Sequence, residues 1–108
     1  EARAALRCTT PDYLPVIGPV VNAASFQRAY AALGKDASKQ PSTSSPWLPG
    51  LFINAAHGSR GLISCPLSGE LIAAQVTGEP LPLPIDLAHS VHPSRFLLRQ
   101  LVRGQGAR

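Results

Sequence analysis

The chain has 108 residues, of which 44% are hydrophobic, which suffices for one small globular unit and is too much for a disordered segment. Its formal net charge of +4 at pH 7 favours an anionic partner such as RNA, although many domains carry such a charge without binding nucleic acid. No run approaches the roughly 18 apolar residues of a membrane span and the first residues lack the apolar core of a signal peptide, so we expect a cytoplasmic protein without a membrane partner.

The first part of the chain predicts two strands. Residues 3–7 predict an edge or final strand that runs into a turn at residues 9–12, where Pro11 and Asp12 supply turn geometry. Residues 15–19 predict a second strand. Because prolines flank it and cannot donate to a ladder, this strand must be brief or lie at a sheet edge.

A compact helix is predicted next. Ser25 is a suitable N-cap, and Gly34 stands where a left-handed residue ends a helix. Phe26, Tyr30 and Leu33 fall on one face at the helical spacing. The helix is therefore expected to bury this aromatic face.

The middle of the chain predicts a strand, a Gly-rich turn and a helix, after a flexible polar loop at residues 35–50. The apolar run of residues 51–56 is typical of a strand buried on both faces of a parallel sheet. The turn of residues 57–61 follows, and the helix has Pro66 in its first turn and ends at Gly78.

Helix N-termini after such strands bind anions or electron-rich cofactor edges. A tight connection that needs its glycines only for steric reasons explains the same turn. The chain also has no GxGxxG motif, so it does not by itself build a dinucleotide site.

The last part predicts a Pro-rich connector at residues 79–92 and an amphipathic terminal helix at residues 93–104. Arg95, Arg99 and Arg103 repeat every four residues on the face opposite the leucines. This stripe suits the phosphates of a nucleic acid. The alternative is a solvated face on a packed helix.

The two cysteines and the first residue of the chain indicate the redox state of the thiols and whether the chain is part of a longer protein. Cys8 and Cys65 form no CxxC pair, so we expect reduced thiols, and we expect no metal site. The chain contains no Met and begins at Glu1, so we expect it to be part of a longer protein.

Three stretches together resemble a known family: LRCTTPDYLPVIGP, PGLFINAAHGSRGLISCPLSGELIAAQVTGEPLPLP and HPSRFLLRQLVRG. They resemble the end of the FAD-dependent domain of the bifunctional bacterial enzymes that modify the tRNA wobble uridine. That domain belongs to the D-amino-acid oxidase and glycine oxidase superfamily. The resemblance implies an α+β fragment made of the last strands of a substrate domain, the final strand and helix of a FAD domain, and a basic C-terminal helix.

The implied activity is oxidative removal of the carboxymethyl group from 5-carboxymethylaminomethyl(-2-thio)uridine, with FAD as hydride acceptor. The implied partners are tRNA and the remainder of the parent enzyme, in which a separate S-adenosylmethionine-dependent domain methylates the amine. By itself the chain is expected to be inactive. Two alternatives stay open: a freestanding basic RNA- or protein-binding module, and a fragment of a glycine or D-amino-acid oxidase.

The resemblance also implies site residues, although it identifies no catalytic residue. Arg7 matches an arginine that holds a substrate carboxylate, a role that suits a bidentate guanidinium. Its alternative is an ion pair with Asp12 across the turn. His57 departs from the family pattern, and it either lies near the flavin or caps the strand. The cofactor-contacting candidates are Gly58, Ser59, Arg60, Gly61 and Leu62.

Overall fold

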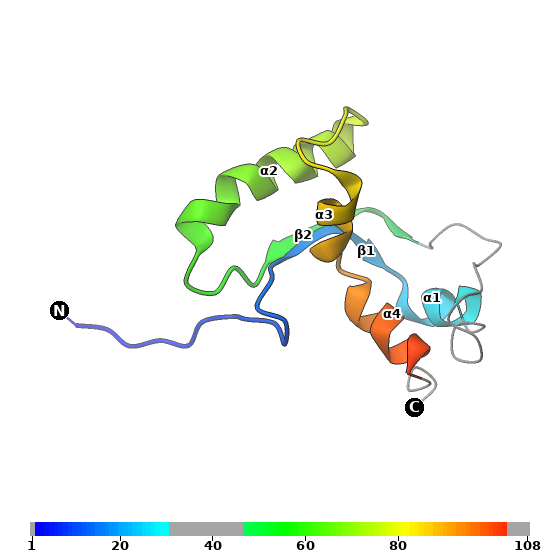
Figure 1. The fold of residues 1–108 in the computed structure, drawn as a ribbon, viewed down its shortest axis with the longest axis horizontal. Helices are drawn as coiled ribbons and strands as arrows, with labels where there is room; N and C mark the ends of the chain where they lie inside the picture. Colours follow the sequence, from blue (N-terminus) through cyan, green and yellow to red (C-terminus); the bar gives the residue numbers. More distant parts are fainter. Residues whose placement is uncertain (1, 31–46, 104–108) are drawn as a thin grey trace. The chain divides into compact units, whose positions relative to one another are not determined.

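The computed structural model describes residues 2–30 and 47–103. The strands β1 and β2 pair in a two-stranded sheet and run in opposite directions (Figure 1). The mixture of helices and strands agrees with the predicted α+β class. In chain order the elements are β1 (Val16–Val21), α1 (Ala23–Ala29), β2 (Trp47–Ala55), α2 (Gly61–Thr77), α3 (Ile85–Ser90) and α4 (Arg95–Val102).

The chain divides into two compact units. Unit 1 comprises Glu1–Gly18 and Phe52–His92, and unit 2 comprises Pro19–Leu51 and Pro93–Arg108. Each unit has buried side chains of its own. The turn between β2 and α2 belongs to unit 1, and the basic helix α4 belongs to unit 2.

The core of unit 1 joins β1, α2 and α3. Ile17, Leu71 and Ala88 are buried together, one from each of these elements. Ile17 N also donates a hydrogen bond of 2.9 Å to Val91 O, just after α3. The core therefore attaches α2 to the sheet through Leu71, which is 1% exposed.

In unit 2, helices α1 and α4 are in contact. Phe26 and Leu101 are buried, and the Phe26 ring stacks on Tyr30 with centroids 4.4 Å apart. The aromatic face predicted for the first helix is thus confirmed as far as Tyr30.

The start of that helix was predicted wrongly. Its N-cap is Asn22, whose Oδ1 accepts a hydrogen bond of 3.2 Å from Ser25 N, because an amide oxygen satisfies a first-turn N–H as well as a serine would. The predicted ending at Leu33 and Gly34 lies outside the described residues, as do residues 35–46 of the predicted loop.

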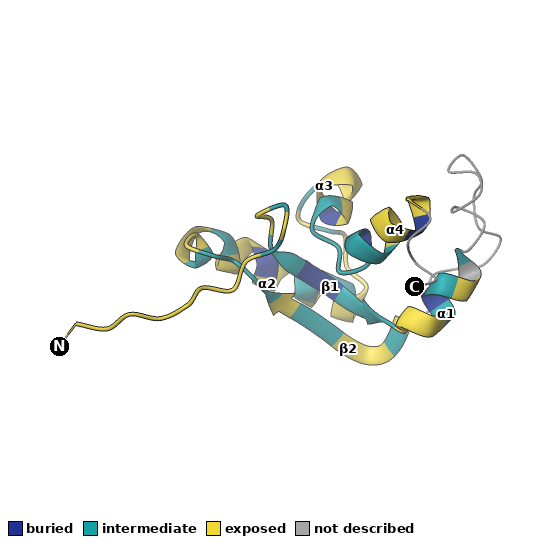
Figure 2. Cartoon of the chain, turned by 90° about the horizontal axis from the view of Figure 1, so that it is seen from below, coloured by how far each residue is buried: buried dark blue, intermediate teal, exposed yellow. Residues whose placement is uncertain are grey.

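The predicted strand at residues 3–7 is absent: residues 2–10 have no regular secondary structure, and residues 2–9 are exposed (Figure 2). Cys8 O accepts a hydrogen bond of 3.1 Å from Gly58 N instead of joining a ladder. The turn that follows is present and is closed by Tyr13 N, which donates to Thr10 O at 3.0 Å.

The strand β2 differs from the prediction in length and burial. It begins at Trp47, so residues 47–50 belong to a strand and not to a loop. It is not buried on both faces of a parallel sheet, because among the described residues it pairs with β1 alone and so is not a central strand; Leu51 remains 50% exposed.

The helix α2 begins earlier than predicted and ends where predicted. Pro66 lies inside the helix, where its missing N–H removes only one hydrogen bond. Gly78, with φ of 74°, supplies the left-handed C-terminal cap. The sequence did not predict the start at Gly61, because the first apolar residues of the helix, Leu62 and Ile63, do not belong to its buried face. Both are exposed.

The connector at residues 79–92 is not extended throughout, because it contains α3. Pro84 precedes this helix, and Pro84 O accepts hydrogen bonds from Leu87 N and Ala88 N at 3.1 Å. Burial of Ala88 in the unit 1 core stabilises this short helix.

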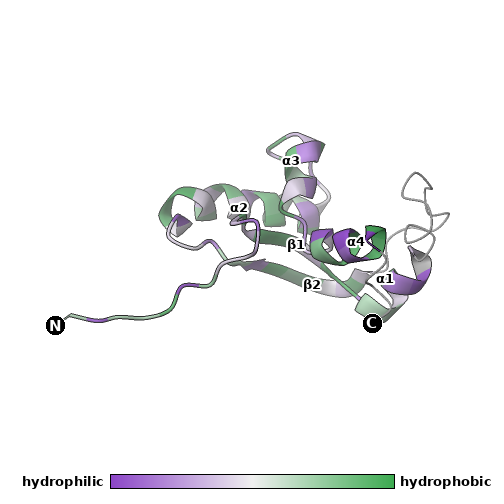
Figure 3. Ribbon diagram, turned by 60° about the horizontal axis from the view of Figure 1, so that its bottom comes forward, coloured by the Kyte–Doolittle hydropathy of each residue, from purple (hydrophilic) through white to green (hydrophobic). Residues whose placement is uncertain are grey.

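The terminal helix α4 is amphipathic, with strongly hydrophilic and strongly hydrophobic residues (Figure 3). The predicted solvent-facing stripe is wrong for Arg95, which is only 6% exposed, with its guanidinium 4.4 Å from the centroid of the Phe96 ring. Arg99 lies over the same ring at 5.3 Å but is exposed, as is Arg103. The flat guanidinium and the hydrocarbon stem of Arg95 allow this burial.

Candidate functional site

The turn between β2 and α2 adopts backbone conformations that few residues accept. Ala56 and Gly58 both have positive φ, 61° and 60°. For Ala56 this is a strained state, of the kind that clusters at functional sites. At Gly58 a Cβ would lie only 3.3 Å from Thr9 Cγ2, so a side chain would require that methyl group to shift, and the positive φ would strain it as well.

The N-terminal segment lies against this turn. Gly58 N donates to Cys8 O, and the Arg7 guanidinium donates to Gly58 O at 3.5 Å. Asp12, the alternative partner of Arg7, accepts from Thr10 Oγ1 at 2.9 Å and from Leu14 N at 3.1 Å. Among the described residues, Arg7 therefore points to the Gly-rich turn and not to Asp12.

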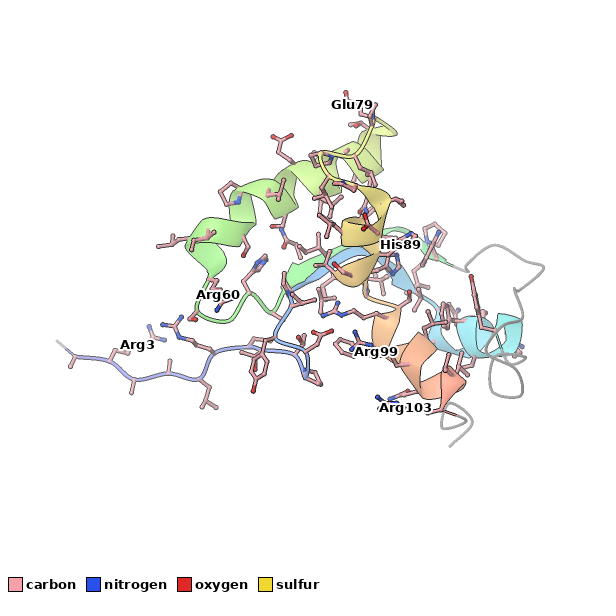
Figure 4. The ribbon with its side chains drawn as sticks, viewed as in Figure 1. Arg3, Arg60, Glu79, His89, Arg99 and Arg103 are labelled. Carbon is pink, nitrogen blue, oxygen red and sulfur yellow. The ribbon has the colours of Figure 1, made fainter. Side chains whose placement is uncertain are left out.

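An open hollow of about 730 Å³ lies at this contact. It brings together all but one of the sequence-derived flavin and carboxylate candidates, and it adds Cys65 and Pro66. Arg60 is the candidate outside the lining; it stands immediately before α2 (Figure 4). The lining residues are Arg7, Gly58, Ser59, Gly61, Leu62, Cys65 and Pro66.

The start of α2 offers donors to this hollow. Arg60 O accepts from Ile63 N and Ser64 N, whereas the N–H groups of Gly61 and Leu62 have no acceptor among the described residues. A helix of 17 residues also carries a partial positive charge at this end. Leu62 adds an apolar side chain that is 99% exposed. Donors beside an apolar surface fit the electron-rich edge of a flat ring such as a flavin.

His57 joins the end of β2 to the first turn of α2. Its Nδ1 lies 2.6 Å from Ser64 Oγ, and its Nε2 lies 2.7 Å from Asn54 Oδ1. Ser64 Oγ donates in turn to Arg60 O at 3.0 Å. This chain of contacts agrees with the alternative in which His57 caps the strand. Sequence reasoning missed Asn54 and Ser64, although their spacing of three and seven residues from His57 was a signal.

Other candidate features lie elsewhere or are not found in the described part of the chain. Arg95, Arg99 and Arg103 belong to unit 2. Cys8 and Cys65 are free thiols. Within residues 2–30 and 47–103, no three His, Cys, Asp or Glu side chains gather as metal ligands. In that same part, no helix is long and apolar enough to cross a membrane.

The chain matches the model of a known protein family. The model of the FAD dependent oxidoreductase family, DAO, matches residues 1–75. The match includes Arg7 and the Gly-rich turn and ends before α3 and α4.

Individual relatives match nearly the whole chain. The chain is 63% identical over 105 residues to the tRNA 5-methylaminomethyl-2-thiouridine biosynthesis bifunctional protein MnmC of Pseudomonas aeruginosa (strain UCBPP-PA14), with 97% of this chain covered. It is 60% identical over 107 residues, 99% of this chain, to the protein of the same name from Ectopseudomonas mendocina (strain ymp). For that of Pseudomonas putida (strain W619) the identity is 61% over 105 residues, again 97% of this chain. The chain spans 16% of the length of each of these relatives.

Proposed function

Because the chain belongs to the family of FAD-dependent oxidoreductases, we propose that it is the part of such an enzyme where the flavin edge and the substrate carboxylate meet. One observation carries the proposal: the Arg7 guanidinium and the start of α2 line the same hollow. The remainder of the parent enzyme would supply the dinucleotide-binding motif that this sequence lacks.

The chain's own residues would bind and orient in this reaction. FAD, when bound, accepts a hydride from the C–H bond next to the substrate amine. The N–H groups of Gly61 and Leu62, at the positive end of α2, would stabilise negative charge at the electron-rich edge of the ring. Arg7 would pair with the substrate carboxylate in a bidentate geometry and so orient the carbon that loses the hydride. Loss of the hydride and of the amine proton leaves an imine, and water hydrolyses the imine to the free amine and glyoxylate, which carries away both carboxymethyl carbons.

The substrate that we propose is 5-carboxymethylaminomethyl(-2-thio)uridine at the wobble position of tRNA, in the cytoplasm. Support comes from relatives about 60% identical to this chain, whose names give tRNA 5-methylaminomethyl-2-thiouridine biosynthesis. In this proposal a separate domain of the parent methylates the product amine with S-adenosylmethionine. The same names favour a tRNA substrate over the small molecule of a glycine or D-amino-acid oxidase.

Anaerobic flavin reduction in the complete enzyme that contains this chain tests the proposal. We expect tRNA that carries the carboxymethylaminomethyl group to bleach the flavin absorbance, and matched tRNA without that group to leave it unchanged. Free glycine is the second comparison. If glycine reduces the flavin as fast as the modified tRNA does, the protein is a small-molecule oxidase and the tRNA assignment is wrong.

We also propose that Arg99 and Arg103 of α4 contact tRNA phosphates, and that Arg95 packs inside unit 2. Replacing Arg99 and Arg103 together with Gln keeps a good helix former at both positions. The affinity of the complete enzyme for tRNA is expected to fall. The slope of log affinity against log salt is expected to flatten by up to about two units, roughly one for each phosphate that is no longer bound.

Arg95→Gln is the matched control. Because Arg95 is buried, this variant is expected to lower the melting temperature of the chain, unlike the double variant. If the double variant kept the wild-type slope of log tRNA affinity against log salt, Arg99 and Arg103 would not bind phosphates. The exposed face of α4 would then be a solvated surface.

A further inference from the structure

Tyr13 stands in a turn that imposes an unfavourable backbone conformation on it. Its φ is 61°, in the left-handed region that glycine accepts freely and a bulky aromatic residue rarely adopts. Tyr13 N donates to Thr10 O at 3.0 Å. Thr10 Oγ1 also bonds Leu14 O at 2.7 Å, and Asp12 Oδ1 accepts from Leu14 N at 3.1 Å. Hydrogen bonds on both sides therefore hold Tyr13 in this conformation.

Packing of the ring does not offset the strain within this chain. The Tyr13 side chain is 83% exposed, and it takes part in none of the ring contacts of the described residues. A glycine at this position would fit the same turn without strain. The ring is thus held out toward solvent by a rigid turn, an arrangement that suits contact with a ligand.

The turn adjoins the candidate site. Thr9 packs against Gly58, and Tyr13 is hydrogen-bonded to the residue that follows Thr9. Arg7, on the N-terminal segment, donates to Gly58 O, and Arg60 stands just before α2 (Figure 4), so positive charge lies at the turn that Thr9 contacts. A ligand that spans the Tyr13 turn and the Gly-rich turn would meet an aromatic face at one turn and positive charge at the other.

We propose that Tyr13 stacks on a base of the RNA substrate, a role that rests on the function proposed above. Every base has a π-face, and exposed aromatic rings beside basic side chains are the usual platform for single-stranded nucleic acid. An anticodon loop presents unpaired bases that can be stacked in this way. A tyrosine ring has little conformational freedom to lose, and the turn removes some of what remains.

Equilibrium binding of tRNA to the complete enzyme tests the role, with three substitutions at one position. Tyr13→Phe keeps the ring, Tyr13→Leu keeps bulk without a ring, and Tyr13→Gly removes the side chain and relieves the strain. We expect the Leu and Gly variants to bind tRNA about 5- to 150-fold more weakly than the Phe variant, as removal of one stacked base predicts. Leu6→Ala, on the same segment and fully exposed, is expected to bind like the wild type.

Thermal melting of the same proteins separates a ligand contact from a packing contact. Tyr13→Gly is expected to raise the melting temperature, because the strain is relieved and no buried side chain is removed. A lower melting temperature in this variant would mean that the ring packs against another part of the enzyme, and this would overturn the proposal. Unchanged tRNA affinity in Tyr13→Leu would overturn it as well.

These measurements separate failure of the Tyr13 stacking role from failure of the proposed oxidation reaction. If modified tRNA reduces the flavin but Tyr13→Leu binds tRNA like the wild type, the function stands and the stacking role is wrong. If Tyr13→Leu weakens tRNA binding but no carboxymethylamine reduces the flavin, the stacking role stands and the proposed reaction is wrong.

Discussion

Replacing Arg7 with Ala in the complete enzyme is expected to lower kcat/KM for the carboxymethylamine substrate by about 10- to 150-fold, with FAD still bound. This range follows from the roughly 1.5–3 kcal/mol that a hydrogen bond to a charged group contributes. Arg7 lines the hollow at the start of α2, where its bond of 3.5 Å to Gly58 O is long enough to be exchanged for a carboxylate. The measurements are the flavin reduction rate on modified tRNA and the absorbance of bound flavin.

Two comparisons make the Arg7 experiment specific. Arg7→Lys keeps the charge but cannot form the bidentate pair, so it is expected to recover only part of the activity. Arg3→Ala removes an exposed charge from the same segment and is expected to have little effect on kcat/KM. Equal losses in Arg3→Ala and Arg7→Ala would indicate a general electrostatic effect and no carboxylate site at Arg7.

Leu71→Ala is expected to lower the free energy of unfolding of the chain by about 2–4 kcal/mol. Leu71 is 1% exposed and joins α2 to Ile17 of β1 and Ala88 of α3. It also lines an apolar hollow of about 230 Å³. Because water can enter the enlarged hollow, we expect a decrease below the upper end of the usual range. Urea denaturation followed by circular dichroism measures it.

Leu62→Ala is the matched control for this prediction. The chemical change is the same and the residue lies on the same helix, but Leu62 is 99% exposed. A surface substitution of this kind is expected to change the free energy of unfolding by less than about 0.5 kcal/mol. If the two variants were equally unstable, the core of unit 1 would not be the contact that holds α2.

The elements with strong local signals were predicted from the sequence alone. The end of α2 at Gly78 and the short strand that became β1 follow from residues near in sequence: a glycine that accepts positive φ, and prolines that limit a strand. The site was predicted only by resemblance, because no local rule connects Arg7 with a turn 51 residues later.

What only the tertiary structure decided depends on contacts between distant residues. The expected strand at residues 3–7 has no ladder partner in the described part of the chain, and the backbone contact of this segment is the bond from Gly58 N to Cys8 O. The periodicity of α4 put Arg95 on the same face as Arg99 and Arg103, yet Arg95 is buried and the other two are exposed. Helical spacing determines which side chains share a face, but packing of the neighbouring segments determines how much of that face water reaches.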